Sequence, residues 1–167
     1  MCLAVVALVG CTSSIANPTP SSAPSAPVAP LLLAPAGGCA DAYFFAIDST
    51  ATSLLQIAVD VGDRSTTAPT EYDFTLPDPK ISVALSRGVE LQEGMCNDFI
   101  TKMRIDSTTK AATGSVHLTV DPSTGTGPFG ACGGISGTAT TKGLTMTDGT
   151  VIADLAITTK DLGCYAG

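Results

Sequence analysis

Apolar and more polar residues alternate over several short segments of this chain, which is the period of a strand with one buried face. The apolar positions are Leu55, Ile57, Val59 and Val61 in the first segment, Tyr72, Phe74 and Leu76 in the second, Ile81, Val83 and Leu85 with Val89 and Leu91 after Gly88 in the third, and Val116, Leu118 and Val120 in the fourth. Pro77-Asp78-Pro79 and Asp121-Pro122 end two of these segments. Short strands at this spacing predict an all-β fold, a single antiparallel β-sandwich or barrel-like domain.

The stretch 94–106 fits two patterns. Met95, Phe99 and Met103 have helical spacing, while Thr101, Met103 and Ile105 alternate as in a strand. We favour a short turn followed by a strand.

Asp148-Gly149 is a preferred two-residue hairpin turn, of the type that needs positive φ at both positions. The register that follows puts apolar positions of both strands on one face, with Lys142 opposite Leu155 as the discordant pair. It places Thr147 opposite Thr150, Met146 opposite Val151, Leu144 opposite Ala153, Thr140 opposite Ile157 and Gly133 opposite Cys164. A one-residue bulge in the glycine-rich run 132–134 would align Cys132 with Cys164.

The first residues are typical of a secretory signal, because 3–10 form an apolar run too short to span a bilayer. The run ends in Leu8-Val9-Gly10-Cys11, which resembles the lipobox of bacterial lipoproteins. The resemblance implies that the Cys11 thiol takes a diacylglycerol, that the signal is removed, and that Cys11 becomes the acylated N-terminus. Two or more acyl chains give stable membrane anchoring. The alternative is a buried strand or helix in which Cys11 is a small apolar residue.

A signal peptide has a positively charged n-region, and neither Lys nor Arg precedes this apolar run. We interpret the difference as a start codon assigned too far downstream. In the lipoprotein family the residues after the cysteine influence sorting, and Asp there retains the protein at the inner membrane. Here Thr12 and Ser13 follow, so the resemblance implies outer-membrane delivery in a host with two membranes.

Residues 12–38 read as a tether, because they contain no charged residue and are rich in Pro, Ala and Ser. The prolines exclude a regular helix and a central strand. Such a sequence favours polyproline II, a semi-rigid spacer of about 3.1 Å per residue. Leu31-Leu32-Leu33 could dock onto the domain and end the spacer early. We therefore expect a signal peptide at 1–10, a lipidated cysteine and tether at 11–38, and a β domain at 39–167.

All charged residues lie from Asp41 onward, so the domain carries the whole net charge of −7. An acidic domain is repelled by phosphate backbones, and we predict no nucleic-acid partner. A divalent cation is the one specific partner that the charge suggests.

The chain has six cysteines. Cys2 leaves with the signal and Cys11 would carry the lipid, which leaves Cys39, Cys96, Cys132 and Cys164. In an oxidising compartment these four suggest two disulfides, with three connectivities. A zinc site is disfavoured because no C-x₂-C pair is present. The hairpin register favours Cys132–Cys164, and hence Cys39–Cys96.

Two glycine-containing motifs resemble sites of chemistry without matching their context. Residues 125–130 spell G-x-G-x-x-G, but the motif contains Pro128, Ala-Cys-Gly-Gly follows it, and no helix is expected there to bind a pyrophosphate. Residues 134–138 approach the nucleophile elbow G-x-S-x-G and end in Thr138 instead of glycine. The single histidine, His117, lies between two inward-facing strand residues and should point to solvent. One imidazole cannot build a histidine metal cluster.

Carboxylates are the remaining candidates for chemistry. Asp60, Asp63, Asp73 and Asp78 could converge on Ca²⁺ at a sheet edge, although turn formers and solvated strand ends show the same pattern. An acid and base pair acting on sugars is disfavoured, because the chain has no Trp and three Tyr to line a sugar cleft. We therefore predict no catalytic, metal-binding or cofactor-binding residue, and Ca²⁺ stays open as the alternative.

These observations predict a lipid-anchored lipoprotein of the bacterial cell envelope. Its domain would serve binding, adhesion or an accessory role, with the membrane as one partner and an envelope protein or polysaccharide as another. The alternative is an extracytoplasmic hydrolase that uses Asp or Glu, with Ca²⁺ bound. No family resemblance covers residues 39–167.

Overall fold

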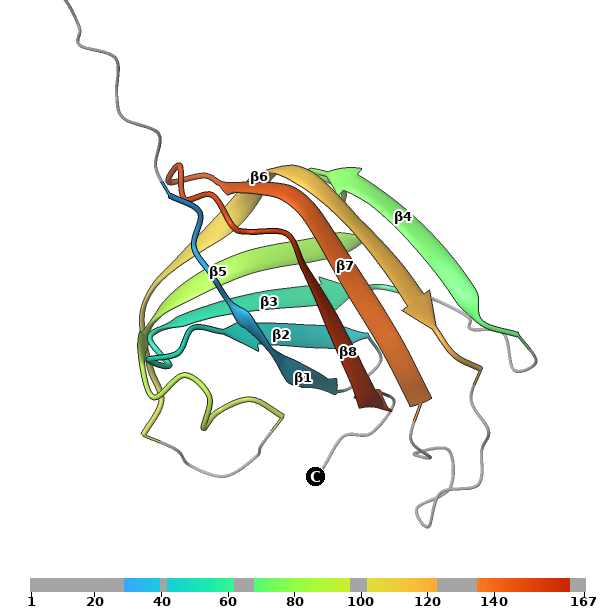
Figure 1. The fold of residues 1–167 in the computed structure, drawn as a ribbon, viewed down its shortest axis with the longest axis horizontal. Helices are drawn as coiled ribbons and strands as arrows, with labels where there is room; N and C mark the ends of the chain where they lie inside the picture. Colours follow the sequence, from blue (N-terminus) through green and yellow to red (C-terminus); the bar gives the residue numbers. More distant parts are fainter. Residues whose placement is uncertain (1–28, 40–41, 62–67, 97–101, 123–134, 163–167) are drawn as a thin grey trace, which may run out of the picture.

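The computed structural model describes residues 29–39, 42–61, 68–96, 102–122 and 135–162. Within them it contains eight strands and no helix (Figure 1). The strands are β1 (Ala34–Cys39), β2 (Tyr43–Ile47), β3 (Ser53–Val59), β4 (Thr70–Leu76), β5 (Ile81–Val89), β6 (Arg104–Val120), β7 (Ile135–Met146) and β8 (Leu155–Leu162). The predicted all-β fold class is confirmed.

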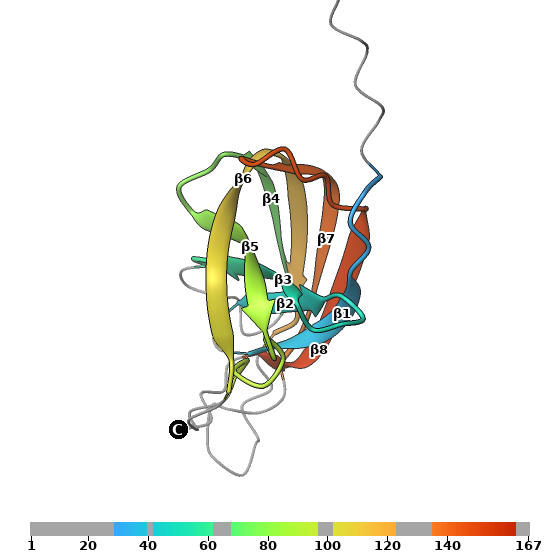
Figure 2. The same cartoon turned by 90° about the vertical axis from the view of Figure 1, so that its left-hand side faces the viewer.

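The strands form one antiparallel, nearly closed, barrel-like sheet in the order β1-β2-β3-β5-β6-β7-β8, with β4 paired to β6 outside this path. The long strand β6 belongs to both halves of the sheet. Its residues 104–110 pair with β5, and its residues 114–120 pair with β4. Figures 1 and 2 show β6 bending between these partners, so that β2, β3 and β5 cross behind β7 and β8, while β1 lies beside β8.

Residues 29–39 join the two ends of the sheet. Leu31 donates its N–H to the Val151 carbonyl (2.7 Å) and accepts from the Ala153 N–H (3.0 Å), beside β8. β1 then pairs with β2, and the Thr159 hydroxyl of β8 donates to the Gly38 carbonyl (3.4 Å). A Cβ at Gly38 would lie 2.8 Å from Thr159 Cγ2, so glycine permits this close approach.

The sheet thus includes residues from the end of the segment 12–38 that was read as a tether, in line with the docking considered for Leu31-Leu32-Leu33. The chain enters the sheet at Leu31, whose side chain packs with that of Leu33 against the main core. The expectation that prolines exclude a central strand holds, because β1 hydrogen-bonds to a single neighbouring strand and can carry Pro35 at the sheet edge.

The main core lies between the two halves of the sheet and contains the inward positions of the four predicted segments. These segments are confirmed as strands β3, β4, β5 and the second part of β6. Val89 differs from its expected place in the apolar pattern: it is 41% exposed, after a bulge between Arg87 and Gly88. Leu91 lies beyond the strand and is buried in a second cluster.

Within the described residues, the stretch 94–106 forms the turn and the following strand that its sequence favours. A turn covers 91–96 and a strand starts at Arg104, while 97–101 lie outside the described part. Ile105 is nevertheless 45% exposed, so this part of β6 does not contribute a buried face.

The hairpin between β7 and β8 is present, but its predicted two-residue turn is wrong. Met146 N–H donates to the Thr150 carbonyl (2.8 Å), so three residues form the loop, and Gly149 alone of these has positive φ (85°). A type I turn followed by glycine in the left-handed region has this geometry. The pairing shifts by one residue, to Thr141 opposite Leu155 and Ala139 opposite Ile157, which removes the discordant Lys142 pair.

Candidate functional site

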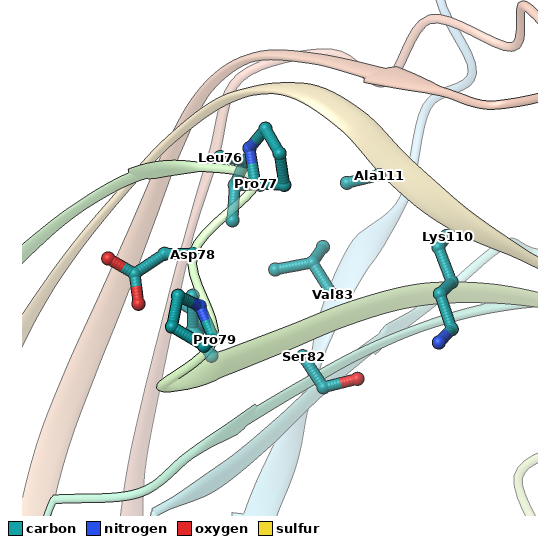
Figure 3. Close-up of a pocket in the computed structure, with 9 residues that line it drawn as sticks. Leu76, Pro77, Asp78, Pro79, Ser82, Val83, Lys110 and Ala111 are labelled. Atoms are coloured by element: carbon teal, nitrogen blue, oxygen red, sulfur yellow. The ribbon is translucent and has the colours of Figure 1, made fainter.

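A cavity of about 320 Å³ lies where β6 changes partner from β5 to β4 (Figure 3). β4 pairs with β6 as far as Leu76, and β5 pairs with it only from Ala84. Residues 77–83 therefore bulge away from β6 and leave a space beside its bend. The wall is formed by Leu76, Pro77, Asp78, Pro79, Ile81, Ser82, Val83, Lys110 and Ala111.

The cavity combines apolar walls with two opposite charges at its sides. Figure 3 shows the Asp78 carboxylate and the Lys110 ammonium on opposite sides, pointing away from each other. Asp78 Oδ1 accepts the Lys80 N–H (2.8 Å), so this carboxylate also orders the turn. The volume is at the low end for ligand sites and suits a small amphipathic group or one apolar side chain.

A second polar site lies on the outward face of the sheet, where β4 pairs with β6. Asp73 is directly opposite His117, and Asp73 Oδ1 lies 2.9 Å from His117 Nδ1. His117 Nε2 lies 3.4 Å from the Thr119 hydroxyl. The order carboxylate, imidazole, hydroxyl is that of a nucleophilic triad. However, the side chains of His117 and Asp73 are 45% and 84% exposed, so water surrounds the imidazole that a triad would shield.

The candidate Ca²⁺ ligands are not brought together in the part of the chain that the structure describes, which holds no group of three His, Cys, Asp or Glu suited to a metal ion. Asp73 faces His117, and Asp78 orders its own turn. Asp60 follows β3, where its N–H donates to the Lys80 carbonyl (2.9 Å). Asp63 lies outside the described residues.

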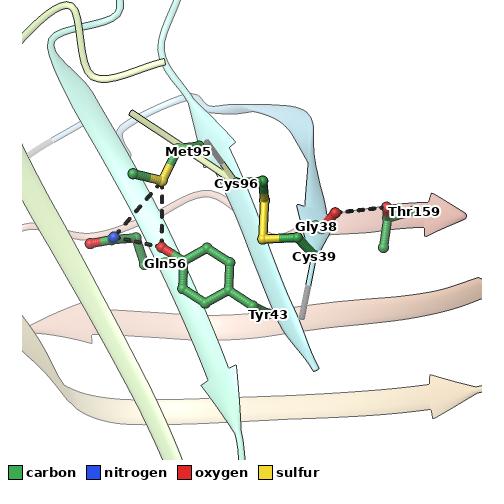
Figure 4. Close-up of a disulfide and its surroundings, with 7 residues drawn as sticks. All are labelled: Gly38, Cys39, Tyr43, Gln56, Met95, Cys96 and Thr159. Atoms are coloured by element: carbon green, nitrogen blue, oxygen red, sulfur yellow. Dashed lines mark hydrogen bonds between the residues drawn. A yellow bond between two sulfur atoms is a disulfide. The ribbon is translucent and has the colours of Figure 1, made fainter. Parts of the chain in front are cut away.

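The Cys39–Cys96 disulfide joins β1 to the turn after β5, as predicted (Figure 4). That turn covers a second apolar cluster on the outer face of the sheet, the outer cluster. Its buried members are Phe45, Ile47, Leu54 and Leu91, with Ala36, Tyr43, Ala51, Met95 and Met103 packed against them.

A short polar network borders the outer cluster. The Gln56 side-chain amide donates to the Tyr43 hydroxyl (2.6 Å), and that hydroxyl donates to the Met95 sulfur (3.5 Å). Burial raises the pKa of the Tyr43 phenol above its usual value, although the hydrogen bond from Gln56 offsets part of the rise. The network therefore holds a neutral phenol at the edge of the cluster.

No protein-family model, curated protein or solved structure matches this chain. Its site residues are thus assigned from their own chemistry.

Several predicted positions lie outside the described residues, namely Cys11, Cys132, Cys164 and the glycine motif at 125–130. Ser136 and Gly137, of the near nucleophile elbow, are inside β7 and not at a strand-to-helix turn. No helix long and apolar enough to cross a bilayer occurs among the described residues.

Sequence reasoning missed the cavity and the contact between Asp73 and His117. Both depend on the pairing of β4 with β6, two strands far apart in the chain. The alternation of apolar and polar residues in 72–76 and in 116–120 shows that each segment is a strand. It does not show that the two strands are neighbours in the sheet.

Proposed function

We propose that this protein is a lipid-anchored binding protein of the bacterial cell envelope, attached through Cys11 and carrying a non-catalytic β domain outside the cytoplasm. An outer-membrane position is part of the proposal for a host with two membranes. The partner would be a protein or polysaccharide of the envelope.

The observation that carries the proposal is the Cys39–Cys96 disulfide. Disulfides persist in exported proteins and are rare in the cytosol, which fits the lipobox-like Leu8-Val9-Gly10-Cys11. The described chain also enters the sheet beside Val151, at one end of the fold. A spacer reaching that point from Cys11 would leave the outer faces of β4 and β6 accessible.

The chemistry of the described residues favours binding over catalysis. Asp78 and Lys110 lie on opposite sides of the cavity, and His117 with Asp73 lies on an exposed sheet face. The alternative, a hydrolase using Asp or Glu with bound Ca²⁺, finds no group of three His, Cys, Asp or Glu residues suited to a metal ion among the described residues.

A pair of cysteine variants tests the anchor. Cys11→Ser should abolish incorporation of labelled fatty acid and release the protein from the membrane fraction, because the acceptor thiol is gone. Cys2→Ser is the matched control and should behave as the wild type, since that thiol leaves with the signal. Undiminished labelling and membrane association of Cys11→Ser would overturn the lipoprotein assignment.

A further inference from the structure

The strand β4 has an open edge. Residues Thr70–Leu76 pair with β6 on one side, and no described strand pairs with the other side. Figure 1 shows β4 at the border of its half of the sheet, with β6 between it and β7. Its outer row of backbone N–H and C=O groups is therefore available to another extended chain.

Proteins usually block such edges with proline, lysine, a bulge, or a covering segment. β1, the strand at the other end of the sheet, is blocked in this way: it contains Pro35, has a bulge between Pro35 and Gly37, and packs against β8. β4 carries the acidic Glu71 and Asp73, but the part of the chain that the structure describes supplies none of the other devices. Its register with β6 is unbroken, and its sequence Thr-Glu-Tyr-Asp-Phe-Thr-Leu lacks Pro, Gly and Lys.

The side chains of β4 define what the edge can accept. Glu71, Asp73 and Thr75 are exposed on the outer face, while Phe74 and Leu76 point into the core. An added strand with Lys or Arg at alternate positions would place cations opposite the two carboxylates, and opposite charges across strands attract. A second copy of β4 pairing antiparallel about Asp73 would set like charges opposite each other, which disfavours self-association through this edge.

The end of β4 also offers a place for an apolar side chain. Leu76 is both the last residue of the strand and part of the cavity wall beside the β6 bend. A strand lying along β4 would reach this cavity with one of its ends. In β-strand addition the backbone ladder supplies affinity, and pockets for particular side chains supply specificity.

We propose that the open edge of β4 binds an extended segment of another protein by β-strand addition, and that this segment alternates Lys or Arg with other residues and ends in an apolar residue at the cavity. The proposal rests on the binding role proposed above, for which it names the partner class. It is independent of the lipid anchor.

The test uses the whole chain, purified from whichever cell fraction contains it, so that a failed anchor leaves this experiment intact. The probe is a fluorescent synthetic peptide in which Lys and Val alternate and Leu is last. Two control peptides carry Glu in place of Lys, or N-methyl groups on alternate backbone amides. Only the first peptide should bind, and it should slow hydrogen exchange of amides in β4.

A charge-matched pair of double variants locates the site. Glu71→Lys with Asp73→Lys should weaken binding of the basic peptide about tenfold or more, since two cross-strand attractions become repulsions. Asp106→Lys with Asp154→Lys changes the net charge equally away from β4 and should weaken binding less than about twofold. If circular dichroism shows that Glu71→Lys with Asp73→Lys disturbs the fold, the double variant Glu71→Gln with Asp73→Asn replaces it.

Three results would overturn the proposal: equal binding by both double variants, equal binding of the N-methylated peptide, or unchanged exchange of β4 amides in the saturated complex. Dimers that the β4 variants abolish would instead assign the edge to a second copy. Retention on an envelope polysaccharide that the same variants abolish would assign it to a glycan. Loss of fatty-acid labelling in Cys11→Ser bears on the anchor alone.

Discussion

The guanidinium of Arg87 on β5 donates a hydrogen bond to the hydroxyl of Thr150, 3.1 Å away, just beyond the β7–β8 turn. The same group lies 3.5 Å from the hydroxyl of Ser53, which is 4% exposed. One side chain thus links the two halves of the sheet at the end where the chain enters the fold.

Replacing this link should lower stability measurably. Arg87→Ala should lower the free energy of unfolding by about 1–2 kcal/mol, because the Ser53 hydroxyl loses a charged donor and the stem of Arg87 loses its packing. Arg104→Ala is the control and should leave the stability unchanged, since Arg104 pairs with Asp106 in solvent. Urea unfolding of both variants measures the difference. Equal losses in the two variants would contradict a role for the Arg87 link.

The β2–β3 hairpin depends on Asp48. Its Oδ1 accepts the N–H groups of Thr52 (2.8 Å) and Ser53 (3.1 Å), and its Oδ2 accepts the hydroxyls of Thr50 and Thr52. Partial burial alone would raise the pKa of this carboxyl, but the four hydrogen bonds together hold it below its usual value.

A lowered pKa in the folded state predicts stability that is present above the unfolded pKa, near 3.9, and is lost as the pH falls through the folded value. The carboxylate is partly exposed to solvent, which screens it, so the effect should stay below about 1 kcal/mol. Asp48→Asn should therefore destabilise at neutral pH and match the wild type near about pH 2. At neutral pH, Asp78→Asn should lower the free energy of unfolding less than Asp48→Asn does, because Asp78 Oδ1 accepts one N–H, that of Lys80. A constant difference between Asp48→Asn and wild type at every pH would refute the linkage.

The strands that could be predicted from sequence are those with one buried face, such as 55–61 and 116–120. β2 was not predicted, because both of its faces are buried. Phe44 belongs to the main core and Phe45 to the outer cluster, so apolar and polar residues do not alternate along this strand. The first part of β6 gave an ambiguous pattern, for which a strand was only favoured over a helix, since residues 104–108 are exposed on both faces and do not alternate.

The register of β7 with β8 was predicted wrongly near the turn but correctly at the far end of the hairpin. The two-residue turn offsets every predicted pair by one residue as far as Gly137. A bulge between Ile135 and Gly137 then restores the offset, so Ile135 faces Leu162 as the predicted register has it. The sequence shows that a turn occurs at Asp148-Gly149. The number of loop residues, however, depends on which side chains of β7 and β8 must point into the core.

Gly149 should be the most sensitive residue of this turn. Its φ of 85° lies in the left-handed region, and a Cβ there would meet no atom within 4 Å, so backbone strain alone decides the outcome. Gly149→Ala should cost about 1 kcal/mol, Gly149→Asn less and Gly149→Val more, in line with the tolerance of each residue for positive φ. Thermal unfolding gives the order. A cost for Gly149→Asn equal to that for Gly149→Val would show that the turn changes type.

The Cys39–Cys96 disulfide should contribute strongly to stability, because it closes a loop with a sequence separation of 57. In the chain-entropy model the double variant Cys39→Ala with Cys96→Ala should lose about 4 kcal/mol. The outer cluster should open first, since the turn carrying Leu91 and Met95 is then held by packing alone. Hydrogen exchange of β2 amides before and after reduction tests this order. Uniform loosening of all strands would contradict it.

The second disulfide remains a prediction, because Cys132 and Cys164 lie outside the described residues. With Cys39 bonded to Cys96, a fully oxidised domain has one remaining connectivity of the three, Cys132–Cys164. Non-reducing peptide mapping of the mature protein should find both pairs and no free thiol in the domain. A Cys132–Cys164 bridge would close the open end of the β7–β8 hairpin and should add about 3–4 kcal/mol in the chain-entropy model. A map with Cys132 and Cys164 both alkylated would refute the bridge.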